Sequence, residues 1–276
     1  MDRSSAHEMQ PFHPYTEVRN RLSELFLEAL ADSERTACVL WLHTFFRICR
    51  PGSLSVSLLD LAEAVSREAI NYPGADGRRA LESLLADFDL LQLRRLESQE
   101  IYRGNTALDA LRWSVGDAIE LYPEFHGHAA YAARRAEMFW TVMEQLRQEV
   151  RPATGGVEDA VARGVLVFNA GLFFEYHEVL EDHWRVAAGD GKRFLQGLIQ
   201  VAVGLQHWQN GNYDGAVILL REGAHRLCVG RPHMLRLDVE SFYRQVQAAR
   251  STLEALGRER THGLSPSLIP KQRLLP

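Results

Sequence analysis

The sequence predicts a mainly all-α protein: an N-terminal winged-helix-like helical unit with one small β-hairpin, followed by a C-terminal antiparallel bundle of about five helices. Three observations predict this fold. Apolar residues recur at helical spacing through most of the 276 residues. Glycines end the helical patterns of the second half. Apolar and polar residues alternate, as is typical of a strand, at one place, 91–96.

One clear break divides the chain. Arg151-Pro152-Ala153-Thr154-Gly155-Gly156 interrupts the helical pattern, because proline and paired glycine both disfavour a continuing helix. We therefore expect a first domain at 1–150, with a winged-helix-like segment at 57–103, and a helical bundle at 157–256. Residues 257–276 are expected to form a tail.

The first domain is expected to begin with helices and then form the hairpin. Its order of helix, turn, helix and hairpin is typical of a winged helix. A long helix at 128–150 would pack against the second domain or against a partner chain, which leaves a homodimer open. The expected helices are 15–31, 34–49, 57–70, 77–90, 106–122 and 128–150, and the hairpin joins 91–96 to 100–103.

The charge of the first domain argues against a DNA-binding surface. Residues 1–150 hold 23 acidic and 16 basic side chains. Arginines at positions 78, 79, 94, 95 and 103 would lie on the recognition helix and the wing, but the acidic residues among them would repel phosphate. Contact with DNA stays open, and packing or contact with a protein is the preferred interpretation.

The second domain is expected to consist of five helices joined by short, glycine-containing turns. Short connections predict antiparallel neighbours. A weak internal repeat, at 169–175 and 210–216, places a turn of small residues before a helix that begins with an aromatic residue. The expected helices are 157–170, 172–188, 192–209, 213–229 and 238–256.

Two of these helices carry polar residues on faces that should be buried. With about 100° between successive residues, His177, Glu181 and Trp184 fall in the apolar stripe of their helix, and Glu178 and Arg185 lie on its rim. The next helix carries a polar stripe, and we expect the two stripes to face each other. The residues of the second stripe are Gln196, Gln200 and His207. Gly197 and Gly204 on the same helix indicate close helix approach or room for a bound group.

Two interpretations of this cluster stay open. It is either an interhelical hydrogen-bond network, since buried polar groups need partners, or a site for a metal or a small molecule. His177-Glu178-Val179-Leu180-Glu181 has the spacing of the zinc-protease helix, with Glu181 in place of the second histidine. In the metal interpretation His177 and Glu181 are ligands of zinc, manganese or iron, with Glu178 as general base. The third ligand would be His207, Glu178 or Glu175, and a bound small molecule would contact Gln196, Gln200, Trp184 and Arg185.

The second half resembles a known family, the bacterial and archaeal helical domain catalogued as domain of unknown function number 309. Residues 168–185 and 194–202 carry the resemblance, followed by His207, Gly211-Asn212 and Gly215-Ala216, and it covers about 157–256. The resemblance implies an all-helical fold, and the label of the family implies a metal-dependent hydrolase. The motif positions of the family map onto Glu175, His177, Glu178, Glu181, Trp184, Gln196, Gly197 and Gln200.

The remaining features describe the class of protein. The three cysteines, Cys38, Cys49 and Cys228, lie in helical patterns and predict reduced residues of a cytoplasmic protein. No apolar run is long enough for a membrane span, so we expect no contact with a membrane. Three functions stay open: a metal-dependent hydrolase, a non-enzymatic ligand-sensing or regulatory module whose first domain contacts DNA or protein, and a cluster with a purely structural role.

Overall fold

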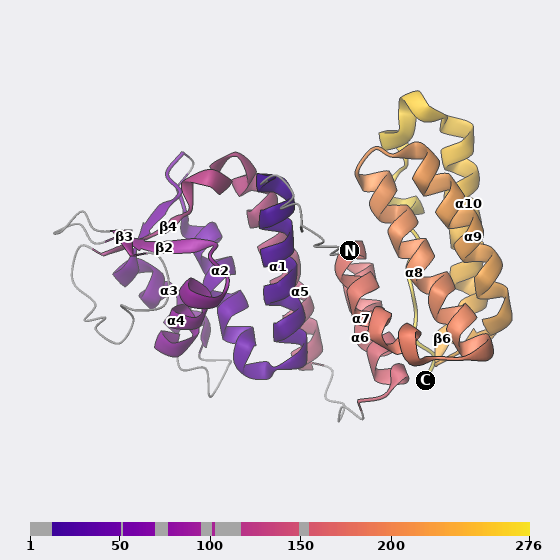
Figure 1. Cartoon of the computed structure of the whole chain (residues 1–276), viewed down its shortest axis with the longest axis horizontal. Coiled ribbons are helices and arrows are strands. Elements are labelled where there is room, and N and C mark those ends of the chain that lie inside the picture. Colours follow the sequence, from indigo (N-terminus) through magenta and orange to yellow (C-terminus); the bar gives the residue numbers. More distant parts are fainter. Residues whose placement is uncertain (1–12, 51, 70–76, 95–100, 103–116, 149–154) are drawn as a thin grey trace, which may run out of the picture. The chain divides into compact units, whose positions relative to one another are not determined.

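The structure is a computed structural model that describes residues 13–50, 52–69, 77–94, 101–102, 117–148 and 155–276 (Figure 1). The chain divides into two compact units, Met1–Trp140 and Thr141–Pro276. The mainly all-α fold is confirmed, because helices account for most of the described residues and the strands are short. Residues 151–154 of the predicted break lie outside the described residues.

Helices form most of the N-terminal unit. Helix α2 is buried on most sides, as its apolar sequence predicts, and Phe26 of α1 stacks on Phe139 of α5 with 4.4 Å between ring centroids. These contacts build the core of the unit. The helices are α1 (Pro14–Ala31), the 3-10 helix η1 (Ser33–Arg35), α2 (Thr36–Ile48), α3 (Leu58–Ala69), α4 (Gly77–Asp87), the 3-10 helix η3 (Pro123–His128) and α5 (Ala129–Gln148).

A small antiparallel sheet accompanies these helices, in the order β1-β4-β2-β3. The predicted pairing of the hairpin is confirmed where it is described, since Leu93 lies opposite Tyr102; its turn lies outside the described residues. The strands are β1 (Ser55–Ser57), β2 (Leu91–Arg94), β3 (Ile101–Tyr102) and β4 (Ala118–Leu121).

The predicted helix at 106–122 is wrong at its end, because residues 118–121 form strand β4. Ile119 is fully buried and lies opposite both Val56 of β1 and Leu93 of β2. Pairing with two strands that are distant in sequence overrides the local helical pattern. The rest of that predicted helix, up to residue 116, lies outside the described residues.

The C-terminal unit contains the five predicted helices, and Figure 1 shows them running alongside one another. Two of the turns between them have the same geometry. Gly171 and Gly211 both have positive φ, and the residue after each glycine donates its N–H to a carbonyl five residues earlier, Val167 or His207. This is the Schellman ending of a helix, which accounts for the glycines of the weak repeat. The helices are α6 (Val157–Asn169), α7 (Phe173–Val186), α8 (Gly189–Gln209), α9 (Tyr213–Leu227) and α10 (Val239–Leu256).

Glycines on α8 and α9 bring these two helices into close contact. A Cβ added at Gly197 would lie 3.0 Å from the backbone N of Leu227, and one at Gly204 would lie 3.1 Å from the backbone N of Leu220. A Cβ at Gly223 would lie 2.8 Å from Val201. Of the two explanations for the glycines of α8, close helix approach is therefore the one the structure supports.

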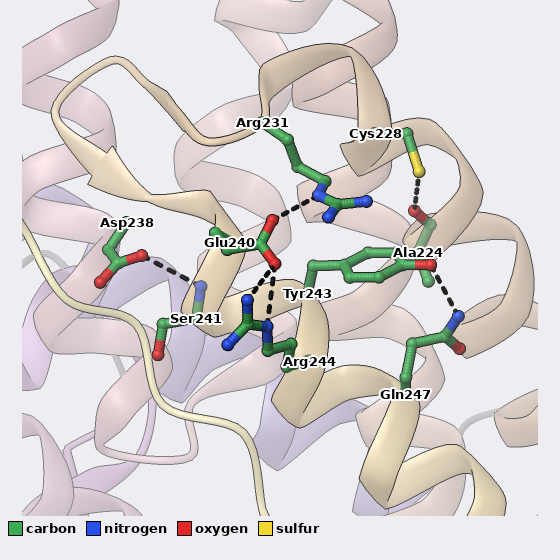
Figure 2. A network of polar contacts seen from close by, with 9 residues as sticks. All are labelled: Ala224, Cys228, Arg231, Asp238, Glu240, Ser241, Tyr243, Arg244 and Gln247. Carbon is green, nitrogen blue, oxygen red and sulfur yellow. Dashed lines mark hydrogen bonds and ion pairs between the residues drawn. The ribbon is translucent and has the colours of Figure 1, made fainter.

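The start of α10 is held by a polar network at the surface (Figure 2). Asp238 accepts a hydrogen bond from the backbone N–H of Ser241, which is the N-cap interaction that satisfies a free donor of the first turn. Glu240 accepts hydrogen bonds from Arg231 and Arg244 at 2.6 and 2.8 Å. The network fixes the chain between α9 and α10.

The segment after α10, expected to be a tail, packs on the C-terminal unit. The 3-10 helices η5 (Arg258–Gly263) and η6 (Pro266–Leu268) lead into an extended segment in which Leu274 bridges to Leu237. Leu237 belongs to the hairpin of β5 (His233–Met234) and β6 (Leu237–Asp238). In the described part of the chain, no helix combines the length and the apolar character that crossing a membrane requires.

Candidate functional site

The orientation of α7 is set by three large side chains on its buried face. Phe173, Tyr176 and Leu180 are fully buried. The ring of Tyr176 lies against Gly164 of α6, where an added Cβ would be 3.0 Å from the ring. The hydroxyl of Tyr176 accepts a hydrogen bond of 2.8 Å from Gln272 of the C-terminal segment. Helix α7 is therefore fixed in rotation.

This rotation gathers His177, Glu178 and Glu181 at the edge of the buried face. One ligand atom from each lies within 4.8 Å of the others. His177 Nδ1 is 3.3 Å from Glu178 Oε1, and His177 Nε2 is 4.0 Å from Glu181 Oε2. Their side chains are 28, 32 and 25% exposed, so an ion from solvent can reach them.

Arg185 is attached to this cluster through one oxygen of Glu181. Its guanidinium donates to Glu181 Oε1 at 2.8 Å and to Asp182 Oδ1 at 3.2 Å. The other oxygen, Glu181 Oε2, faces His177. A carboxylate held in this way by a guanidinium has a fixed orientation, and its second oxygen stays available as a ligand.

Trp184 lies one helical turn beyond Glu181. It is half-buried, and its ring carries the ammonium group of Lys192, which lies 5.1 Å from the ring centroid. Lys192 belongs to the first turns of α8 and also donates to the carbonyl oxygen of Arg185 at 3.3 Å. The residues that line this edge therefore come from both α7 and α8.

Two of the expected metal ligands lie elsewhere. Glu175 is fully buried and does not belong to the group of potential ligands that His177, Glu178 and Glu181 form. His207 Nδ1 lies 3.0 Å from Asn212 Nδ2, at the turn between α8 and α9. The imidazole is packed against Gly215, which places it in the turn.

Among the polar contacts that the structure describes, none joins the polar stripe of α8 to His177 or Glu181 of α7. Gln200 donates to Glu222 of α9 at 3.1 Å, and the described polar contacts of His177 and Glu181 stay within α7. The physical reason is the rotation of the two helices: Gly197 and Gly204 turn that face of α8 toward α9. Gln196 is half-buried and no described polar contact ties it to the cluster.

Lys192 is the residue of this region that sequence reasoning missed. Its sequence signal is weak, because a lysine near the start of a helix is ordinary on a solvated surface. Its position over Trp184 depends on the short connection at Ala187 and Ala188, where the chain turns from α7 into α8. A spacing rule within one helix does not reach across such a turn.

In a comparison with known proteins, one family model matches the helices that carry the cluster. A search of curated proteins finds no match to the chain. Residues 161–219, which run from α6 into α9, match the model of the family described as Domain of unknown function (DUF309), and the C-terminal half of this chain resembles that family.

Proposed function

We propose that the C-terminal unit binds a divalent metal ion at His177, Glu178 and Glu181 and acts as a metal-dependent hydrolase. The observation that carries the proposal is the convergence of one imidazole and two carboxylates, with ligand atoms within 4.8 Å, on a face that solvent reaches. Two carboxylates this close repel each other, and a cation between them would relieve the repulsion.

The set of ligands indicates the metal and its role. One nitrogen and carboxylate oxygens suit zinc, manganese or iron. Three protein ligands leave positions open for water, and a bound ion of this kind lowers the pKa of that water and so supplies a nucleophile. Glu178 has two oxygens, one to hold the ion and one to accept a proton. Arg185 orients Glu181 from outside the ligand set.

The test of metal binding is thermal unfolding with and without zinc or manganese. A ligand at 100 times its dissociation constant stabilises the folded state by about 2.7 kcal/mol, so the melting temperature of the full chain should rise. His177→Ala should remove the rise. His183→Ala is the matched control, since His183 lies on the same helix outside the cluster, and it should keep the rise.

The test of hydrolysis uses p-nitrophenyl acetate and p-nitrophenyl phosphate with the metal-loaded chain. Glu178→Gln should lose turnover by at least about 100-fold, because it removes the general base and weakens one ligand of the ion. His177→Ala should lose it through loss of the ion. Metal binding without hydrolysis of either compound would leave a ligand-sensing module and reject the enzyme.

A second proposal concerns the N-terminal unit, which we propose is a winged-helix-like module for contact with protein. The order α2, β1, α3, α4, β2 and β4, with β4 between β1 and β2, supports this fold assignment. Arg94 of β2 is paired with Glu120 at 2.9 Å, and Arg35 is paired with Asp87 of α4 at 2.5 Å. Arginines neutralised in this way are poor phosphate contacts. Arg95 and Arg103 lie outside the described residues.

The test of this second proposal is fluorescence anisotropy of a labelled DNA duplex at low salt. We expect weak binding that Arg94→Ala does not change, because the guanidinium is already occupied by Glu120. Tight binding that falls steeply with salt and with Arg94→Ala would instead assign DNA to this unit.

A further inference from the structure

We infer that Lys192 binds an anionic oxygen group, a phosphate or a carboxylate, of the molecule on which the metal site acts. The inference rests on the proposed metal site and deepens it, because it names the substrate class. Its basis is the position of one ammonium group at the edge of α7, which no described ion pair joins to a carboxylate.

Lys192 is held in place against Trp184 and the last turn of α7. Its ammonium group lies 5.1 Å from the centroid of the Trp184 ring and 3.3 Å from the carbonyl oxygen of Arg185. A cation over an indole ring is attracted to it, and an ammonium group has three donors, of which the carbonyl takes one. The group is therefore positioned with two donors left.

The neighbouring cations differ from Lys192 in being neutralised. Arg185 is paired with Glu181 and Asp182, and Arg193 is paired with Asp190 at 3.5 Å. Among the ion pairs that the structure describes, none joins Lys192 to a carboxylate. A positioned lysine without a carboxylate partner is a point charge free to bind an external anion.

The spacing on α7 relates this anion to the metal site. His177, Glu181 and Trp184 follow one another at intervals of four and three residues on one face of the helix. Trp184 is about 4.5 Å from Glu181 along the helix axis, at about 1.5 Å per residue. Because Lys192 is anchored on Trp184, we expect the substrate to be a small molecule that reaches from the metal site to this ammonium group with its phosphate or carboxylate.

The experiment measures binding of inorganic phosphate, and separately of acetate, to the full chain loaded with manganese. Isothermal titration gives the affinities, and broadening of the ³¹P signal by manganese shows that phosphate lies near the ion. The variant is Lys192→Met, which removes the charge and keeps an apolar chain over Trp184. Arg193→Met is the matched control, because it removes a positive charge one residue away that is already paired.

Lys192→Met should weaken anion binding by about tenfold, the effect of losing one charge-assisted hydrogen bond, and Arg193→Met should change it by less than about twofold. Manganese affinity should stay equal or rise slightly in Lys192→Met, because a nearby positive charge repels the ion. The arm with the larger effect, phosphate or acetate, identifies the anion.

Three results overturn the inference. They are an equal loss in both variants, no loss in Lys192→Met, and the absence of phosphate and acetate binding by the manganese-loaded chain. Failure of the metal site itself is seen separately, since the wild-type chain would then show no saturable binding of manganese before any anion is added.

Discussion

At the scale of single residues, the hydrogen bond between Tyr176 and Gln272 is the contact that ties α7 to the C-terminal segment. Both side chains are buried, and Gln272 also donates its backbone N–H to the side chain of Asn169 at 2.9 Å. Because Tyr176 precedes His177, this contact fixes the part of α7 that carries the cluster.

Removal of one partner of this buried bond should destabilise the chain. Tyr176→Phe leaves the amide of Gln272 without an acceptor, and the expected loss is about 1–3 kcal/mol in denaturant titration. The double variant Tyr176→Phe, Gln272→Leu should lose less than the sum of the two single variants. Strict additivity would show that the two groups do not interact.

The same tyrosine predicts a pH dependence. Burial raises the pKa of the Tyr176 phenol above its ordinary value of 10.0, so the phenol stays neutral in the folded chain at a pH where it ionises in the unfolded chain. Its contribution to stability is complete below about pH 10 and is lost as the pH rises above that value. Alkaline unfolding should begin at higher pH in Tyr176→Phe than in the wild type, once both are normalised to their stability at pH 8.

At the scale of elements, the contact between α8 and α9 depends on the absence of side chains at three positions. Gly223 is the tightest of them, with Val201 Cγ2 at 2.8 Å and the carbonyl oxygen of Gly197 at 2.9 Å from an added Cβ. Both helices would have to separate to admit a methyl group there.

Gly223→Ala should therefore destabilise the C-terminal unit although alanine favours helices. Overpacking costs about 1–3 kcal/mol, against about 1 kcal/mol gained in helix propensity. Gly191→Ala on α8 is the control, because nothing lies within 4 Å of its added Cβ, and it should be neutral or stabilising. Equal stability of both variants in denaturant titration would contradict the close contact.

The sequence carried enough information to predict the helices but not the rotation of α7. Apolar spacing and glycine turns are local signals, and the five helices of the second half lie close to where these signals place them. The buried face of α7, by contrast, is centred on Tyr176 and Leu180, because Gly164 of another helix admits the tyrosine ring. The pattern of α7 alone does not contain that information, so Trp184 is less deeply buried than the pattern predicts.

The part of the candidate site that lies on α7 could be predicted, because it depends on local spacing. His177, Glu178 and Glu181 are close through helical spacing alone, whereas the expected contributions of Gln200 and His207 required the relative rotation of two helices. The sequence pattern did not predict strand β4 for a related reason. Its pairing with β1 and β2 joins segments that are far apart in the chain.

At the scale of the whole molecule, the chain consists of two units, each with a core of its own. The cluster belongs to the C-terminal unit, and a bound ion stabilises only the part of the chain that folds around it. We therefore expect two unfolding transitions in calorimetry, of which one shifts upward with manganese. Phe26→Ala, in the core of the N-terminal unit, should lower the other transition. A shift of both transitions with manganese would show that the ion binds elsewhere as well.

Elemental analysis of the purified full chain is the most direct measurement of the metal site that we propose at His177, Glu178 and Glu181. After incubation with manganese or zinc and removal of free ions, the wild type should retain about one ion per chain, the stoichiometry of a single three-ligand site. Glu181→Gln keeps the size of the side chain and deletes its charge, and it should lose most of that metal, whereas His183→Ala should keep it. A wild-type chain without metal, or equal metal in wild type and Glu181→Gln, would contradict a metal site at these three residues.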